Sequence, residues 1–153
     1  MKRVLLTGMS GTGKSAVVVA LVALGIKAVD SDYGWCETAS DGEWIWDEGK
    51  IQELLSHEDA EVLFIAGCAS NQGKFYEQFD LVILLSAPTD LIIERIENRE
   101  ENPFGKSPEE MSKLLADLEL VEPLLRASAG AEVPTDRSLD EVVADVIRLS
   151  MKV

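Results

Sequence analysis

The chain has 153 residues and a formal net charge of -14, because 28 Asp and Glu side chains outnumber 14 Lys and Arg side chains. This charge argues against a nucleic-acid partner, since such binding depends on basic side chains that neutralise phosphates. The length suits one domain with a buried core, so we expect a single domain over residues 1–153.

Two further features bear on where the protein works. The longest apolar stretch, residues 16–24, is too short to cross a bilayer, and the first residues lack the apolar core of a secretory signal. Cys36 and Cys68 lack the spacing of a metal or redox pair, so we expect free thiols. We therefore expect a cytoplasmic protein with no membrane partner, either a monomer or a homodimer.

Short apolar runs alternate with helical patterns along the chain. The runs that predict buried strands are residues 3–7, 27–29, 62–66, 81–86 and 131–133. The patterns that predict helices are residues 14–24, 48–56, 89–100, 108–128 and 139–151, with one or two further turns within 73–79. This alternation predicts an α/β fold, a five-stranded parallel sheet with helices on both faces. Ligands of such sheets bind beyond the carboxyl ends of the strands.

The sequence Gly-Met-Ser-Gly-Thr-Gly-Lys-Ser at residues 8–15 joins the first predicted strand to the first predicted helix. It matches the pattern G-x-x-x-x-G-K-[ST], in which backbone N–H groups and the helix N-terminus bind phosphates. We expect Lys14 to reach the outer phosphates and Ser15 to supply one oxygen ligand to Mg²⁺. The segment predicts a nucleoside triphosphate site formed by Gly8, Ser10, Gly11, Thr12, Gly13, Lys14, Ser15 and Ala16.

Asp30 and Asp32 follow the second predicted strand and should lie at the same edge of the sheet as this loop. One carboxylate there could support Mg²⁺ through water, while the other orients or deprotonates an acceptor hydroxyl. We assign Asp30 to the metal and Asp32 to the acceptor. The alternative is that Asp-Ser-Asp is ordinary turn chemistry at a strand end.

Arg95 and Arg99 lie four residues apart and therefore share one face of a predicted helix. Neither has an acidic residue three or four positions away, and two like charges at this spacing repel each other. This arrangement indicates an external anion between them. Pairing with distant parts of the chain is the alternative.

Three segments in chain order resemble the adenylate-kinase-like branch of P-loop kinases, and shikimate and gluconate kinases in particular. They are the loop at residues 8–15, Asp-Ser-Asp at residues 30–32, and Arg-Ile-Glu-Asn-Arg at residues 95–99 before a segment with Pro and Gly. The resemblance implies ATP as the phosphoryl donor, Mg²⁺, and the strand order 2-3-1-4-5, with the five strands numbered along the chain.

The same resemblance implies roles for single residues. It places Arg95 against the phosphates and Arg137 near adenine, and it implies a short lid over about residues 100–107. The residues to which it gives a catalytic role are Lys14, Asp32, Arg95 and Arg99.

The sequence departs from shikimate kinases on the acceptor side. Gly67-Cys68-Ala69 stands where those enzymes have three glycines, and two of their arginines have no counterpart here. An acceptor carboxylate would lack cationic partners, so we do not expect a shikimate kinase. Aromatic and amide side chains suit a neutral acceptor such as a nucleoside or a sugar. The residues that we assign to the acceptor are Asp32, Trp35, Gly67, Asn71 and Gln72.

The three tryptophans, Trp35, Trp44 and Trp46, could equally be partly buried packing residues. With either role, the sequence predicts an ATP-dependent phosphotransferase that moves the γ-phosphoryl group to a hydroxyl of a nucleoside or sugar-like molecule. One alternative is a nucleoside monophosphate kinase, which would need a further arginine from Arg126 or Arg137. The other is a nucleotide-dependent switch without a small-molecule acceptor.

Overall fold

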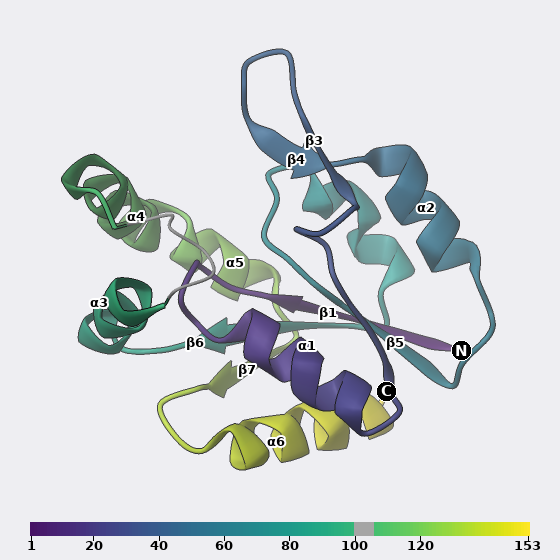
Figure 1. Cartoon of the computed structure of the whole chain (residues 1–153). Helices are drawn as coiled ribbons and strands as arrows, with labels where there is room; N and C mark the ends of the chain where they lie inside the picture. The colour runs from purple at the N-terminus through teal and green to yellow at the C-terminus, as the bar shows by residue number, and fades with distance from the viewer. Residues whose placement is uncertain (100–105) are drawn as a thin grey trace.

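A computed structural model of the chain describes residues 1–99 and 106–153. Its centre is a sheet of five strands, all paired in parallel, in the order β2-β5-β1-β6-β7 (Figure 1). Numbered along the chain these strands run 2-3-1-4-5, which confirms the predicted fold and strand order. The strands are β1 (Lys2–Thr7), β2 (Lys27–Asp30), β5 (Val62–Ala66), β6 (Leu81–Ser86) and β7 (Ala131–Pro134).

Helices cover both faces of this sheet because alternate side chains of each strand point to opposite faces. Val4 and Leu6 of β1 belong to the core beneath α1 (Lys14–Ala23) and α6 (Leu139–Met151). Leu5 points the other way, into the core beneath α2 (Glu48–Ser56) and the 3₁₀ helix η1 (Gln72–Gln78). Within the described residues, no helix is both long enough and apolar enough to span a bilayer.

The predicted helix over residues 108–128 is two helices, α4 (Pro108–Leu120) and α5 (Glu122–Ser128). The break lies at Val121, directly before the first turn of α5, which contains Pro123. Proline has no N–H to donate, and its ring clashes with the carbonyl group four residues earlier, so a continuous helix is disfavoured at this point. The bend matters for function because both helices line a cavity described below.

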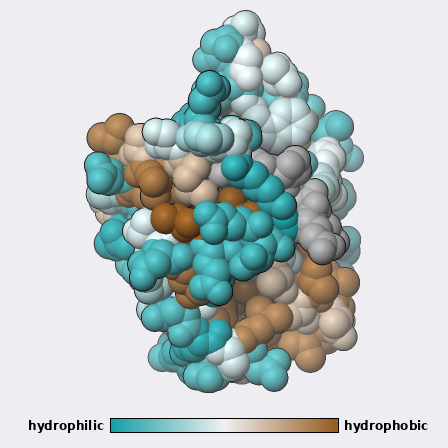
Figure 2. All heavy atoms as spheres, turned by 60° about the vertical axis from the view of Figure 1, so that its left-hand side comes forward, coloured by the Kyte–Doolittle hydropathy of each residue, from teal (hydrophilic) through white to brown (hydrophobic). Residues whose placement is uncertain are grey.

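A two-stranded antiparallel hairpin, β3 (Cys36–Thr38) and β4 (Trp44–Trp46), was not predicted. It projects from the sheet at the top of Figure 1. Figure 2 turns the side with α3 (Thr89–Asn98) and α4 forward. Hydrophilic residues cover much of the middle of that side, and hydrophobic residues gather on the left and at the lower right of the view. The predicted lid falls mainly on residues 100–105, outside the described part of the chain.

Candidate active site

The loop between β1 and α1 has a backbone that only glycine adopts readily. Gly13 has φ +101° directly before α1, where an L side chain would be strained. At Gly8 the limit is space, because a Cβ atom would lie 2.5 Å from the carbonyl oxygen of Leu85. The loop therefore packs closely against the end of β6 and leads straight into the N-terminus of α1, where free N–H groups favour an anion.

Lys14 reaches back over this loop. Its ammonium group donates hydrogen bonds to the carbonyl oxygens of Gly8, at 2.6 Å, and Met9, at 3.0 Å. Thr12 is buried, and its hydroxyl also donates to Met9, at 2.8 Å. Burial lowers the pKa of the Lys14 ammonium from its ordinary value, and nearby acidic groups, Asp32 among them, oppose that effect. The positive charge is thus held at the loop, where phosphates would lie.

Ser15 and Asp30 meet at the start of α1. The Ser15 hydroxyl donates to one carboxylate oxygen of Asp30 at 2.7 Å, and the other oxygen accepts from the backbone N–H of Asp32 at 3.2 Å. Hydroxyl and carboxylate oxygens are the ligands that Mg²⁺ prefers. The pair predicted to support the metal is therefore brought together, and its chemistry fits the ion.

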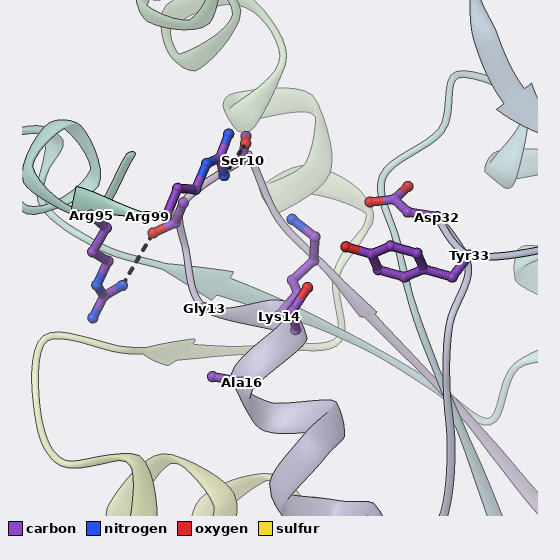
Figure 3. Close-up of a pocket in the computed structure, with 10 residues that line it drawn as sticks. Ser10, Gly13, Lys14, Ala16, Asp32, Tyr33, Arg95 and Arg99 are labelled. Carbon is purple, nitrogen blue, oxygen red and sulfur yellow. Dashed lines mark hydrogen bonds between the residues drawn. The ribbon is translucent and has the colours of Figure 1, made fainter. Parts of the chain in front are cut away.

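Asp32 faces the same loop from the end of β2. In Figure 3 the Lys14 side chain rises from α1 with Ser10 and Arg99 on one side and Asp32 and Tyr33 on the other. Loss of water around the Asp32 carboxyl raises its pKa, the charge of Asp30 raises it further, and the Lys14 ammonium opposes both. A carboxylate with a raised pKa is better suited to accept a proton near neutral pH.

Arg95 joins three segments of the site. Its guanidinium donates to the Gly11 carbonyl at 3.2 Å (Figure 3), to the Thr135 hydroxyl at 2.9 Å and to the Thr135 carbonyl at 2.6 Å. Thr135 is buried beyond the end of β7, and its hydroxyl lies 2.7 Å from the Thr12 carbonyl. Arg95 thus links α3, the phosphate loop and the end of β7 through oxygen atoms that carry no formal charge.

Arg99 follows α3 and donates to the Ser10 hydroxyl at 3.3 Å. Burial lowers the pKa of this guanidinium, whereas Tyr33 and Glu110 raise it. Arg137, predicted near adenine, donates to the Pro134 carbonyl and forms an ion pair with Asp145.

Two cavities open on the loop. The first, of about 480 Å³, is lined by Ser10, Gly11, Gly13, Lys14, Ser15, Ala16, Asp32, Tyr33, Arg95 and Arg99. The second, of about 680 Å³, lies towards η1, α4 and α5. Three residues, Ser10, Lys14 and Asp32, line both cavities. We call the first the loop cavity and the second the α4–α5 cavity.

Asp32 lines both cavities, but most of the other residues predicted to bind the acceptor line neither. Gln72 lines the α4–α5 cavity, but its amide is used within the protein, on Thr7, Ala69 and Tyr76. The Asn71 amide bonds both backbone groups of Trp46 and thereby anchors β4. Neither cavity is lined by Asn71.

The Gly67 and tryptophan positions are explained by packing. A Cβ atom at Gly67 would lie 2.1 Å from the Ser31 hydroxyl, which accepts a hydrogen bond from the buried Trp46 indole. Trp35 packs against the same core and lines neither cavity, and Trp44 is about half exposed on the hairpin.

Residues that the sequence analysis did not assign also line the cavities. Tyr33 stands directly after Asp32, so its position beside a predicted site residue was a usable signal. Lys113 and Asp117 reach the α4–α5 cavity from α4, and only the packing of that helix reveals this.

Comparison with known proteins gives a family and several structures. A family model described as an AAA domain matches residues 4–115. A shikimate kinase from Acinetobacter baumannii in complex with shikimate is similar to the chain, with a TM-score of 0.72 and 25% identity over 99% of this chain and 94% of that one. A gluconokinase from Sinorhizobium meliloti 1021 has a TM-score of 0.68 and 21% identity over 99% and 94%.

A third solved structure, a shikimate kinase from Bacteroides thetaiotaomicron, has a TM-score of 0.72 and 19% identity over 97% of each chain. At these lower identities the likeness concerns the fold. No curated protein sequence matches the chain.

Proposed function

The chain belongs to the AAA domain family, and from this we propose that it is an ATP-dependent phosphotransferase that moves the γ-phosphoryl group to a hydroxyl of a small nucleoside or sugar-like molecule. The observation that carries the proposal is that the loop cavity and the α4–α5 cavity share Ser10, Lys14 and Asp32. Phosphoryl transfer needs a donor and an acceptor that meet at one charged boundary.

The loop cavity suits the donor. Backbone N–H groups of the loop and the N-terminus of α1 would bind the phosphates together with Lys14. Mg²⁺, held near Ser15 and Asp30, would neutralise charge on the phosphate oxygens. Arg99 lines the same cavity and adds positive charge where the transferred group would pass.

The transfer itself assigns a proton role to Asp32. The acceptor oxygen bonds to the γ-phosphorus, the bond between that phosphorus and the β–γ bridging oxygen breaks, and ADP leaves. The hydroxyl proton goes to the Asp32 carboxylate, whose raised pKa favours this step. Arg95 acts by holding Gly11 of the loop against Thr135, which keeps the donor site in place.

The solved structures support a small-molecule acceptor, since they include shikimate kinases, a gluconokinase and a protein described as a sugar kinase. A nucleoside monophosphate acceptor has less support. Arg126 pairs with Glu122 and Glu132, Arg137 pairs with Asp145, and neither arginine lines one of the two cavities.

The test separates transfer from donor binding. Asp32→Asn should lower acceptor-dependent ADP release at least a hundredfold and leave the dissociation constant for Mg-ATP within about twofold. Lys14→Ala should weaken Mg-ATP binding as well. Glu77→Gln, an exposed change on η1 outside both cavities, serves as the control. An Asp32→Asn protein that keeps its turnover would refute the proton role. ADP release that no acceptor stimulates, with tight ATP binding, would favour the switch.

A further inference from the structure

Resting on this proposed function, we infer that the acceptor carries an amino group besides its hydroxyl, and that Asp117 binds the ammonium. The acceptor class is then a hydroxylated amine, such as an amino sugar. The inference comes from the charges, the unused hydrogen-bonding groups and the apolar surface of the α4–α5 cavity.

The charge of the cavity wall favours a cation. Among the described residues, three carboxylates line it, those of Asp32, Glu43 and Asp117, together with the ammonium groups of Lys14 and Lys113. Three carboxylates therefore stand against two ammonium groups, and the Lys14 ammonium is hydrogen bonded to carbonyl oxygens of the phosphate loop. The described lining contains no arginine. An anionic acceptor would be repelled here, and the net charge of -14 adds to that repulsion.

Asp117 is the carboxylate best placed to bind the amine. It is half-buried on α4, and within the described residues its carboxylate takes part in no hydrogen bond or ion pair. Lys113 lies four residues earlier on the same helix and does not pair with Asp117. On a helix, a lysine four residues before an acid pairs less well than an acid four residues before a lysine. A half-buried carboxylate gains most from an external donor that carries positive charge.

Tyr76 offers the cavity a second directional group. Its hydroxyl accepts a hydrogen bond from the buried Gln72 amide at 2.9 Å, and that amide is fixed in turn by Thr7. The Tyr76 proton is therefore free to be donated to a ligand hydroxyl. The cavity thus combines a carboxylate that can accept hydrogen bonds from an ammonium with a Tyr76 hydroxyl that can donate one to a ligand hydroxyl.

Part of the remaining wall is apolar, and most of that part comes from the bend between α4 and α5. Leu125 is buried there, Val121 is half-buried and Leu124 is 67% exposed, and the buried Met9 joins them from the phosphate loop. Such a wall suits the C–H face of a sugar or cyclitol ring. The three features together describe a compact ring with hydroxyl groups and an amine.

The experiment measures ADP release from Mg-ATP with matched acceptors: glucose against 2-amino-2-deoxyglucose, a cyclitol against its amino derivative, and gluconate as the anionic probe. We expect kcat/KM for an amine to exceed that of its parent by at least tenfold. A neutral or anionic compound as the preferred acceptor would overturn the inference and leave the proposed function standing. Absence of stimulation by every compound would contradict both.

Two variants test the residue. Asp117→Asn should lower kcat/KM for the amine roughly tenfold to a hundredfold, the range for a charge-assisted hydrogen bond, and leave the neutral parent unchanged. Lys113→Met, on the same face of α4, should leave kcat/KM for the amine unchanged or raise it. If Asp117→Asn lowered kcat/KM equally for the amine and for its neutral parent, Asp117 would have a structural role only.

Discussion

The Thr135 hydroxyl offers a direct test of how the phosphate loop is held. It accepts from the Arg95 guanidinium at 2.9 Å and lies 2.7 Å from the carbonyl oxygen of Thr12 and 3.1 Å from that of Ser86. Its single proton can serve one carbonyl at a time. Because Ser86 also accepts from the Thr135 backbone at 2.7 Å, the proton belongs with Thr12. Thr135→Val keeps the shape of the side chain and removes both bonds.

The magnitude follows from these contacts. The bond with the charged guanidinium contributes roughly 1.5–3 kcal/mol, and the bond to the Thr12 carbonyl roughly 0.5–1.5 kcal/mol. Arg95 retains the carbonyl oxygens of Gly11 and Thr135, which offsets part of the loss. We therefore expect Thr135→Val to lower the free energy of unfolding by about 2–3 kcal/mol. For a domain of this size that lowers Tm by roughly 5–10 °C.

The assay is urea denaturation, with Thr135→Ser as the matched control. Serine keeps the hydroxyl and deletes a buried methyl, which costs about 1 kcal/mol. The hydrogen-bond account predicts stability in the order Thr, then Ser, then Val. If packing alone held this residue, the Val variant would be as stable as Thr or more so and the Ser variant would be the least stable, and that order would contradict a role for the hydroxyl. Mg-ATP binding should weaken several-fold in Thr135→Val and stay near normal in Thr135→Ser.

Three further predictions concern single contacts. Gly67→Ala should lower the free energy of unfolding by about 1–3 kcal/mol, because its Cβ would displace the Ser31 hydroxyl from Trp46; Ser31→Ala in the same chain should recover part of that loss in denaturation. Gly8→Ala should lower the free energy of unfolding by a similar amount, since its Cβ would meet a main-chain oxygen of β6. It should also weaken Mg-ATP binding, measured by titration. Unchanged binding would contradict the close packing of the loop. Asp32→Asn should raise Tm at neutral pH, because the raised folded-state pKa of Asp32 imposes a cost that grows as pH rises above the ordinary pKa and is complete above the raised one. The gain should vanish in a pH series that falls below the ordinary pKa of about 3.9, where the carboxyl is protonated in both states; a pH-independent gain would contradict this.

The sheet was predictable because its strands are short apolar runs between polar segments. β5 and β6 begin and end at the predicted residues, and both are almost wholly buried between helices. The phosphate loop was equally clear, since its chemistry depends on residues that are adjacent in the sequence. Ser15 and Asp30 could be paired because the start of α1 and the end of β2 both lie at the carboxyl edge of the parallel sheet.

The errors have local causes. The apolar pattern over residues 108–128 outweighed the proline within it, although proline ends or bends a helix. The hairpin was also signalled, because Asp41-Gly42 stands shortly before the β-favouring run Trp-Ile-Trp, after Cys-Glu-Thr.

Other features depend on tertiary contacts that no local pattern encodes. The Asn71 amide was predicted to bind an acceptor, but the backbone of Trp46, far away in the sequence, uses it. Arg95 has no acidic residue three or four positions away in the sequence, and its partners in the structure are the Gly11 carbonyl and Thr135, forty residues later. Asp117 lines the α4–α5 cavity only because the bend between α4 and α5 brings this face of α4 to the cavity.

The proposed reaction transfers the γ-phosphoryl group to an organic hydroxyl across the boundary formed by Lys14 and Asp32. The most direct measurement uses γ-³²P-labelled ATP with Mg²⁺ and the matched acceptors, and follows the label together with ADP. We expect one labelled organic phosphate for each ADP formed, and we expect Asp32→Asn to lose the label from that product. Label that appears only as inorganic phosphate, at a rate no acceptor changes, would contradict it.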